Sequence, residues 1–452
     1  MIDSNYIALQ KIKEYILDKE RELLLRLLED IQPVDKAEIF DELSEDEIAG
    51  IFRLLDDEEA AAVLEEMDEA GYAGLVERLG DARASRIIRE MSTDDAADLL
   101  SELSPEKVND ILSHMDQEDA EDVRELLYYP EDTAGGLMTN EYVHVLEDVT
   151  VAEAIELVRG QAKDAEIVYY IYVLDKNNKL VGTLSFRQLL VNEANCLVRN
   201  VMITNVISVQ VNTDQEEVAR IVAKYNFLAV PVIDLYGKML GIVTVDDVID
   251  VIHEEATEDM YRMVGHTSSD DSESELNAWQ RAAKRMPWML VLLLGGVLAG
   301  FIIEKFSATL QSMLALAFFI PVMAGAAGNA ATQSLAVVSR GLATGQFGDK
   351  DLWKVVLRES KVGLLMGLGC GLVLSLVAVL WQGSLLLGIL TGVSLALSML
   401  IAAMLGGLAP LLIKQSGIDP AVVSGPLITM AIDILSMLIF FGLAGLFLCK
   451  IF

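Results

Sequence analysis

Cysteine is scarce in this sequence, and the arrangement of the few cysteines excludes two common kinds of site. The chain of 452 residues contains three, Cys196, Cys370 and Cys449, and no two of them form a CxxC pair. Thiols this far apart provide neither a disulfide framework nor a zinc motif, and they fit a reducing, cytosolic compartment. The N-terminal segment, with Asp3 and Lys11, also lacks the apolar core of a signal peptide.

Basic residues are also few, because 34 Lys and Arg oppose 69 Asp and Glu and leave a formal net charge of −35. The imbalance is confined to the N-terminal part. Residues 1–274 hold 62 acidic and 23 basic side chains, whereas residues 275–452 hold 7 and 11. A surface this negative repels phosphate, so we predict no nucleic acid partner and expect multivalent cations as partners instead.

Long apolar runs fill the C-terminal part of the chain. They lie near residues 287–304, 312–338, 362–381, 385–413 and 421–448. Each run reaches the roughly 20 residues that cross a hydrocarbon core. Basic residues precede the first run and separate the second from the third, so the positive-inside rule assigns the N-terminus to the cytoplasm. We predict a multi-pass protein of the cell (plasma) membrane, embedded in the lipid bilayer, with its C-terminus outside.

Two features interrupt the apolar pattern of these runs. Residues 324–333 read AGAAGNAATQ, and such small residues allow either a close helix crossing or a helix break that lines a cavity with carbonyl groups. Asp433 is the only charged residue between Asp419 and Lys450. A carboxylate at the centre of a bilayer costs about 2.5–3.5 kcal/mol, so Asp433 should face water or a bound cation, or be protonated against another helix.

A twelve-residue period runs through residues 43–115. The apolar positions are Leu43, Leu55, Met67, Leu79, Met91, Leu103 and Met115, followed in turn by Ser44, Asp56, Asp68, Gly80, Ser92, Ser104 and Asp116. Most of these second residues are helix N-caps, whose side chains accept an otherwise unpaired backbone N–H for about 1 kcal/mol. Twelve residues make one short helix and a turn, so we predict a helical solenoid in which no unit is stable alone.

Residues 138–258 alternate twice between strand and helix patterns. Each copy has a strand, a helix that opens at Thr150 or Thr213, and a hairpin that turns near Lys176 or Tyr236. Each copy closes with a Gly-x-x-[Ser/Thr] strand end that leads into a helix. This pattern resembles a tandem pair of CBS domains, a regulatory module that often binds adenosine nucleotides.

The acidic part ends in a charged helix predicted from Asp246 to Met263. Four acids share one of its faces at helical spacing, namely Asp247, Asp250, Glu254 and Glu258, with Glu255 and Asp259 beside them. Like charges at this spacing destabilise a helix. The helix therefore needs counter-cations or a partner surface that supplies them; otherwise the segment is only a solvated acidic linker.

The order of these parts, together with TVDDVIDVIHEEATEDMYRMVG, GNAATQ and the lone Asp433, resembles the MgtE magnesium channels over essentially the whole chain. The resemblance implies a homodimer with Asp433 of each subunit at the ion site of a two-fold pore, and Asn329 on the pore wall. The fold class it implies is multidomain, with an α-helical repeat superhelix, α/β tandem CBS domains and an all-α five-span transmembrane domain.

The predicted domains are the acidic helical-repeat N domain (1–134), CBS domain 1 (135–200), CBS domain 2 (201–245), the connecting helix and linker (246–275) and the transmembrane domain (276–452).

The resemblance also implies that cytosolic Mg²⁺ closes the pore. Ions would bridge the acidic surfaces and hold the charged helix against the pore, so the transported ion would regulate its own uptake. The residues implied to bind these ions are Asp95, Asp214, Glu216, Asp247, Asp250, Glu254, Glu255, Glu258, Asp259 and Asp419.

A nucleotide site in the CBS pair is a second implication, with ATP as the expected ligand. Tyr170 and Phe227 would stack the adenine and Arg187 would meet phosphate. Thr244 and Asp247 would hold the ribose. The alternative is that Tyr170 and Phe227 are core residues of the CBS pair.

Other function classes remain open from the sequence. A proton- or sodium-coupled transporter or exporter of divalent metal would use Asp433 as a proton relay. A membrane-tethered sensor of cations or nucleotides would transport nothing. An enzyme is not expected, because the sequence contains no nucleophile elbow, P-loop or zinc motif.

Overall fold

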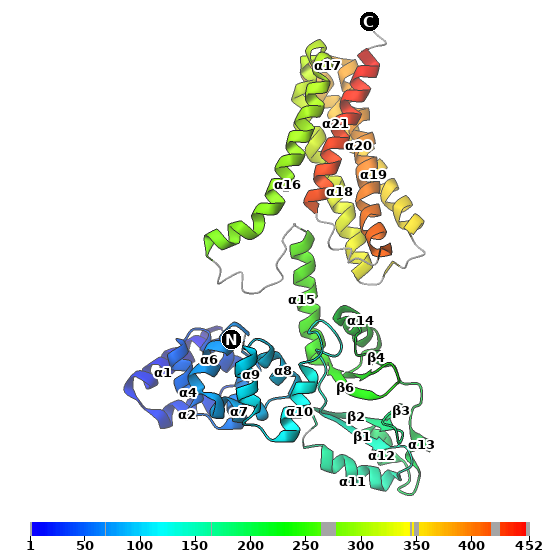
Figure 1. The fold of residues 1–452 in the computed structure, drawn as a ribbon. Coiled ribbons are helices and arrows are strands. Elements are labelled where there is room, and N and C mark those ends of the chain that lie inside the picture. The colour runs from blue at the N-terminus through cyan, green and yellow to red at the C-terminus, as the bar shows by residue number, and fades with distance from the viewer. Residues whose placement is uncertain are drawn as a thin grey trace. The chain divides into compact units, whose positions relative to one another are not determined.

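Short helices build the N-terminal part of the chain, two small sheets follow, and long helices form the C-terminal part (Figure 1). The computed structural model describes residues 2–67, 69–163, 165–263, 277–343, 346–347, 352–416 and 425–448. The chain divides into two units, Met1–Ile252 and His253–Phe452.

The helical repeat predicted from the twelve-residue period is confirmed. Three helices come first, α1 (Ile2–Asp18), α2 (Arg21–Glu29) and α3 (Pro33–Phe40). The repeat helices are α4 (Glu45–Phe52), α5 (Asp57–Leu64), α6 (Glu69–Leu79), α7 (Asp81–Arg89), α8 (Thr93–Ser101), α9 (Pro105–Leu112) and α10 (Gln117–Leu126). Their first residues lie twelve positions apart, because each helix begins directly after one of the periodic cap residues.

The caps act as the sequence predicts. Ser44 and Glu47 form a capping box in which the backbone N–H of Ser44 donates to Glu47 Oε2 over 2.9 Å. Asp56 Oδ1 accepts the backbone N–H of Glu59 over 2.7 Å. Gly80 begins α7 with φ +80°, a left-handed conformation that glycine adopts without strain. The cap at Asp68 lies outside the described residues.

Tandem CBS domains are likewise confirmed, as two three-stranded sheets of the same topology. The first copy contains β1 (Tyr142–Leu146), α11 (Val151–Gln161), β2 (Ile167–Leu174), β3 (Leu180–Ser185), α12 (Phe186–Val191) and α13 (Val198–Val201). The second contains β4 (Val209–Gln210), α14 (Gln215–Tyr225), β5 (Ala229–Ile233) and β6 (Met239–Thr244). In each copy the first strand pairs parallel with the second, which pairs antiparallel with the third.

The segment that precedes β1 pairs with the second CBS copy. The backbone N–H of Gly135 donates to the carbonyl of Val211 over 2.8 Å, and Thr139 exchanges two backbone hydrogen bonds of 2.9 Å with Ile242. One buried apolar cluster accordingly runs from the repeat helices through Ala134 and Met138 to the second copy. The repeat helices and the second copy therefore share a core.

The charged helix is present as α15 (Val245–Met263). Val248 and Val251 are the only buried residues of this helix. Seven of its 19 residues are acidic, and carboxylates are rarely buried.

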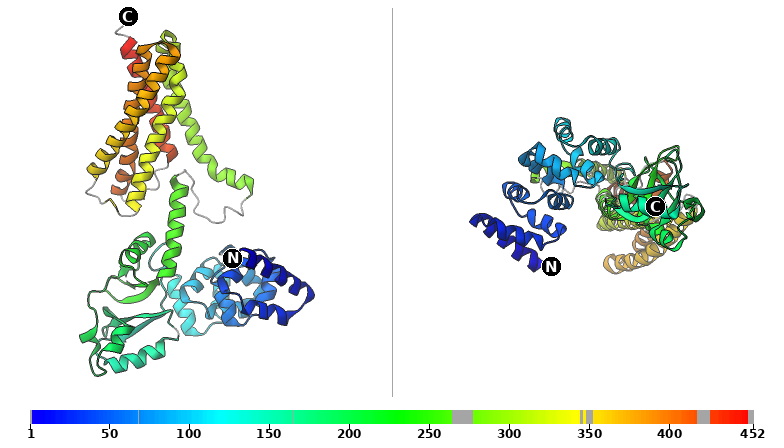
Figure 2. Two further views of the ribbon diagram at one scale, coloured as in Figure 1. Left: turned by 180° about the vertical axis from the view of Figure 1, so that it is seen from behind. Right: turned by 90° about the horizontal axis from the view of Figure 1, so that it is seen from below.

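Five helices among the described residues are long and apolar enough to span a membrane. They are α16 (Ala278–Lys305), the span Leu314–Leu342 formed by η2 (Leu314–Phe319) and α18 (Ile320–Ala343), α19 (Leu352–Gln382), α20 (Leu385–Gln415) and α21 (Gly425–Leu448), with the short α17 (Ser307–Ser312) before η2. The prediction of five spans is thus confirmed, although α16 begins before Pro287 because Asn277 caps it with Gln280. Figure 2 shows the first turns of α16 diverging from the other four helices.

Small residues bring these helices close together. A Cβ atom added to Gly363, Gly367 or Gly371 of α19 would lie 2.5–2.6 Å from atoms of α20. A Cβ on Gly406 of α20 would lie 2.2 Å from the carbonyl oxygen of Ala331 on α18. Helix α18 is continuous through residues 324–333, so of the two interpretations of that segment the structure supports a close helix crossing, not a helix break.

Candidate functional site

At the N-termini of α8 and α15, a Ser or Thr hydroxyl donates a hydrogen bond to an acidic side chain three residues later. Ser92 begins α8, and its hydroxyl donates to Asp95 Oδ2 over 2.6 Å. Thr244 precedes α15, and its hydroxyl donates to Asp247 Oδ2 over 2.5 Å. Acids are favoured in the first turn because the unpaired N–H groups there carry partial positive charge. Asp94, beside Asp95, is in that turn of α8 as well.

Residues 134–140, the segment between α10 and β1 that we call the linker, connect the N-terminus of α8 to that of α15. Thr93 of α8 donates its hydroxyl to Asn140 Oδ1 over 2.9 Å, and the same hydroxyl lies 3.1 Å from that of Thr139. Thr139 pairs in turn with Ile242 of β6, the strand that leads into α15. The N-termini of α8 and α15 are therefore held close together by the pairing of the linker.

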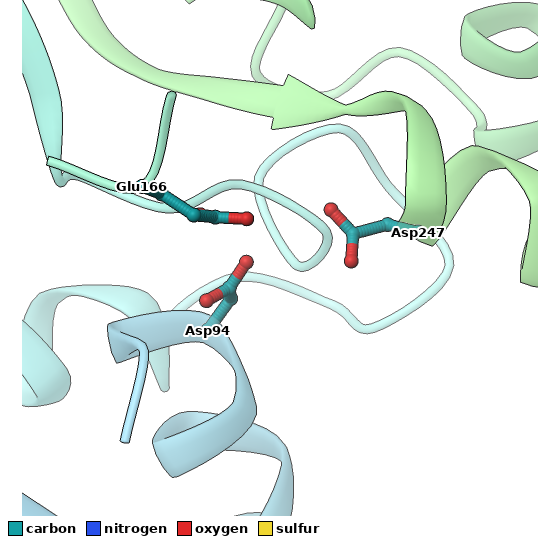
Figure 3. A group of neighbouring side chains, drawn as sticks. All are labelled: Asp94, Glu166 and Asp247. Carbon is teal, nitrogen blue, oxygen red and sulfur yellow. The ribbon is translucent and has the colours of Figure 1, made fainter. Parts of the chain in front are cut away.

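Three carboxylates from three segments meet at this point. Asp94 on α8, Glu166 before β2 and Asp247 on α15 each offer an oxygen, and these oxygens lie within 4.8 Å of one another. Figure 3 shows their carboxylates turned toward a shared space. Asp94 is buried, with a relative exposure of 5%, and its Oδ1 has no hydrogen-bond partner among the described residues. We refer to these three residues as the acidic triad.

The electrostatics of the acidic triad disfavour three bare negative charges. Burial, together with the charges of Asp247 and Glu166, raises the pKa of Asp94 well above its usual value. Burial of the Glu166 carboxylate and repulsion from Asp247 raise the pKa of Glu166 to about 8. Burial raises the pKa of Asp247 to about 6 even though the Thr244 hydroxyl opposes the shift. Three bare charges at this point are therefore unfavourable, and a bound proton or cation would relieve the repulsion.

More acids surround the triad. Burial raises the pKa of Asp95, and Asp246 and Asp250 add to the shift; the pKa of Glu66 is raised by burial and by repulsion from Asp95 and Asp250. The charged groups that shift these pKa values are all carboxylates, and each of them raises the pKa of its neighbour. Oxygen ligands of this kind suit Mg²⁺ or Ca²⁺, so the donor set fits a hard divalent cation.

The structure brings together only part of the predicted sensor set. Asp95, Asp247 and Asp250 belong to the acid cluster around the triad. Asp214 instead caps α14 by accepting the backbone N–H of Glu216 over 2.9 Å, and both residues are exposed.

The acids toward the C-terminal end of α15 belong to the second unit. Of these, Glu254 is exposed, and Glu255, Glu258 and Asp259 are half-buried, with Glu258 paired to Arg262. Asp419 lies outside the described residues.

The predicted nucleotide residues lie in the two CBS copies. Tyr170 packs against a buried cluster that contains residues of both copies, and Phe227 stacks on Tyr225 with ring centres 5.4 Å apart. Arg187 is exposed on α12. Thr244 is fully buried and its hydroxyl is already bound to Asp247. The structure thus agrees with a core role for Tyr170.

Within the second unit, Asp433 lies on α21 and faces α18. Its Oδ1 is buried and has no hydrogen-bond partner among the described residues. A Cβ added to Gly328 would lie 3.2 Å from this oxygen and 2.8 Å from Thr429 Cγ2. One turn along, the hydroxyls of Thr332 and Thr429 lie 3.2 Å apart. Asn329, next to Gly328, is exposed.

Two members of the acidic triad are absent from the residues proposed from the sequence. Asp94 is adjacent to the cap-linked Asp95, and a pair of acids in one helix turn is a weak signal that could have included it. Glu166 is a single acid before a strand, and no local pattern distinguishes it. Its backbone N–H donates to the carbonyl of Glu141 over 3.2 Å, and this tertiary contact brings it to α8 and α15.

Comparison with known families covers most of the chain. The family described as MgtE, divalent cation transporter, matches residues 320–443. The MgtE intracellular N domain matches residues 31–132, and the CBS domain matches residues 134–194 and 198–254. These matches follow the same order as the repeat helices, the two sheets and the long helices. With its five apolar helices, the chain is a multi-pass membrane protein.

Two solved structures resemble the first part of the chain. One is described as the soluble part of a magnesium transporter; it is 34% identical with a TM-score of 0.52 and covers 56% of this chain and 99% of its own. The other is the cytosolic domain of the Mg²⁺ channel MgtE in complex with ATP, 39% identical with a TM-score of 0.52, covering 54% of this chain and 99% of its own.

Two relatives match this chain over most of its length. The magnesium transporter MgtE of Bacillus subtilis is 41% identical over 326 residues, which are 72% of each chain. The magnesium transporter MgtE of Thermus thermophilus is 42% identical over 327 residues, again 72% of each chain. Both are named as transporters, a class distinct from enzymes. Identity at this level over this share of the relatives shows that the chain belongs to the MgtE family of magnesium transporters.

Proposed function

We propose that this chain is a Mg²⁺-selective, Mg²⁺-gated channel for magnesium uptake, acting as a homodimer in the plasma membrane. The observation that carries the proposal is Asp433, a carboxylate on an apolar helix whose buried Oδ1 faces α18 without a hydrogen-bond partner among the described residues. A carboxylate in that place costs about 2.5–3.5 kcal/mol on insertion scales, so it requires a compensating role.

The chemistry of Mg²⁺ fits such a site. The ion is small, prefers octahedral oxygen ligands and loses its water reluctantly, so a pore does best by holding the hydrated ion. In a homodimer two Asp433 carboxylates would match the charge of one divalent ion, with Asn329 and backbone carbonyls near its water shell. Contact through water is weak enough to allow release, which conduction requires.

Gating would come from the cytosolic acids. At low Mg²⁺ the acidic triad and its neighbours repel one another, which favours separation of α8 from the start of α15. Bound Mg²⁺ would cancel that repulsion, hold α15 in place and close the pore, with the acids near the end of α15 and Asp419 contributing further sites. In this arrangement the N-terminus is cytoplasmic and the C-terminus is outside.

An adenine nucleotide is the second ligand that we propose, bound to the CBS pair. The support is the related cytosolic domain in complex with ATP, which is 39% identical to this chain. Phe227 and Arg187 would contact the base and phosphates and Asp247 would contact the ribose, whereas Tyr170 packs in the shared core and Thr244 supports Asp247 from its buried position. Because Asp247 also belongs to the acidic triad, nucleotide and Mg²⁺ binding would be coupled through it.

The decisive test of the function is ion flux through the purified full chain in liposomes with Mg²⁺ varied on the cytosolic side. A channel gives current set by the Mg²⁺ gradient and the voltage, and the current falls as cytosolic Mg²⁺ rises. Flux that requires an opposing proton or sodium gradient would indicate a coupled transporter or exporter instead. Absence of flux would leave a sensor without transport.

A single substitution tests the acidic triad. Glu166→Gln removes one of its three carboxylates, so we expect the Mg²⁺ concentration needed for half-maximal protection to rise about tenfold. The measurement is hydrogen exchange in the full chain, read at the first turns of α8 and α15 as MgCl₂ is added. Glu193→Gln, an exposed acid of the same CBS copy, is the matched control and should leave the midpoint unchanged. An unchanged midpoint in Glu166→Gln would contradict the assignment.

A further inference from the structure

A second acid is buried within the membrane unit and has no role in the pore described above. Glu359 lies on α19, with a relative exposure of only 4%. Its Oε2 accepts the hydroxyl of Ser334 on α18 over 2.9 Å. Its Oε1 lies 3.8 Å from Nε of Arg358, whose side chain is largely exposed. Burying a carboxylate is unfavourable unless it is paired and hydrogen-bonded, so the contact with Ser334 is one that the buried Glu359 depends on.

The position of Glu359 is set by the glycines of the α19–α20 crossing. Gly363, Gly367 and Gly371 follow it at four-residue spacing, and each lies against α20 at a distance that leaves no room for a Cβ atom. At the Glu359 level α20 provides the space instead, because a Cβ on Gly407 would lie 3.0 Å from Glu359 Cγ. The side chain therefore passes over α20 and reaches α18.

The same level of α20 also contacts α18 directly. Gly406 lies against the backbone of Ala331, while its neighbour Gly407 lies against Glu359. Glu359 therefore links three helices, because it extends from α19, packs on α20 and bonds to Ser334 of α18. Gly328, which faces Asp433, lies six residues before Ser334 on α18, or about 9 Å from it along the helix axis.

We propose that Glu359 is a positioning residue for the ion path, acting through Ser334 to hold α18 against α20 so that Gly328 and Asn329 keep their place opposite Asp433. This inference rests on the proposed channel function. Asp433 contacts α18 near Gly328 and Glu359 contacts it at Ser334, so the small-residue segment is fixed at two points on different faces. Loss of the Ser334 bond frees α18 to shift and changes the width of the path.

The test is Mg²⁺ and Ca²⁺ flux through the full chain in liposomes, normalised to the amount of folded protein. We expect Glu359→Ala and Ser334→Ala each to lower Mg²⁺ flux about tenfold and to lower the Mg²⁺/Ca²⁺ flux ratio, since a displaced α18 no longer holds the path at the width that suits hydrated Mg²⁺. Glu359→Gln keeps an oxygen that can accept the Ser334 hydroxyl and should restore both values. The double alanine variant should be no worse than either single one, because both remove the same bond.

General destabilisation would lower Mg²⁺ and Ca²⁺ flux in proportion, so the ratio separates positioning from a merely structural role. Glu304→Ala, an exposed acid at the end of α16, is the control and should behave as wild type. If Glu359→Ala fails to fold, Ser334→Ala decides alone. Wild-type flux and ratio in the alanine variants, or failure of Glu359→Gln to restore them, would overturn the inference. Absence of flux in the wild type would overturn the channel proposal itself, and this inference with it.

Discussion

Asp433→Ala is expected to reduce Mg²⁺ flux by on the order of 100-fold while leaving the protein folded. A 100-fold loss corresponds to about 2.7 kcal/mol, which a carboxylate acting on a divalent ion can supply even at an effective dielectric constant of about 20. The fold should survive because the substitution removes a carboxylate oxygen that has no hydrogen-bond partner among the described residues. The measurement is uptake into liposomes that contain the purified full chain, alongside its thermal unfolding temperature.

Two further variants sharpen this result. Asp433→Asn keeps the size of the side chain and removes its charge, so flux as low as in Asp433→Ala would assign the effect to charge. Glu304→Ala removes an exposed acid of the same unit and should retain wild-type flux. Wild-type uptake by Asp433→Ala would remove Asp433 from the pore.

The second large effect is expected from the acids of α15. A variant that neutralises them together, with Asp247, Asp250, Glu255, Glu258 and Asp259 changed to the corresponding amides, should conduct at cytosolic Mg²⁺ concentrations that close the wild type. Several weak Mg²⁺ sites that each favour the closed channel add their free energies of binding. Changing the channel from almost fully closed to almost fully open takes about 5.5 kcal/mol in total. The measurement is channel current in patches as cytosolic Mg²⁺ is raised.

This variant needs a control for the change in net charge. Amide substitutions at five exposed acids of the repeat helices, Glu106, Asp110, Glu118, Glu121 and Glu125, make the same charge change away from α15. That control should still close at high Mg²⁺. If the α15 variant closes at the same Mg²⁺ concentration as the wild type, cytosolic sensing by α15 is wrong.

Local chemistry explains which elements could be predicted. The helix starts of the repeat follow from caps such as Ser44 and Asp56, because a cap acts on the N–H groups of its own helix. The apolar runs predict the spans for a similar reason, since the bilayer requires length and hydrophobicity only. The tandem sheets were predictable because each copy repeats the same strand and turn signals.

Tertiary proximity explains what could not be predicted. The acidic triad depends on the linker that pairs with β6, and nothing near Glu166 in sequence points to Asp94 or Asp247. Glu359 lies among the basic residues that indicate membrane orientation, so its local sequence suggests a surface position, whereas Gly407 and Ser334 give it a buried one. Asp433 was predicted because a single charge within a long apolar run is itself a local anomaly.

The linker has a consequence for synthesis on the ribosome. Gly135 and Thr139 find their partners at Val211 and Ile242, so the nascent chain carries them unpaired until both CBS copies have emerged. The repeat helices are made first, yet the apolar surface they share with the second copy stays uncovered for that whole interval. A fragment truncated between the two copies should therefore aggregate or recruit chaperones, although every one of its helices is intact.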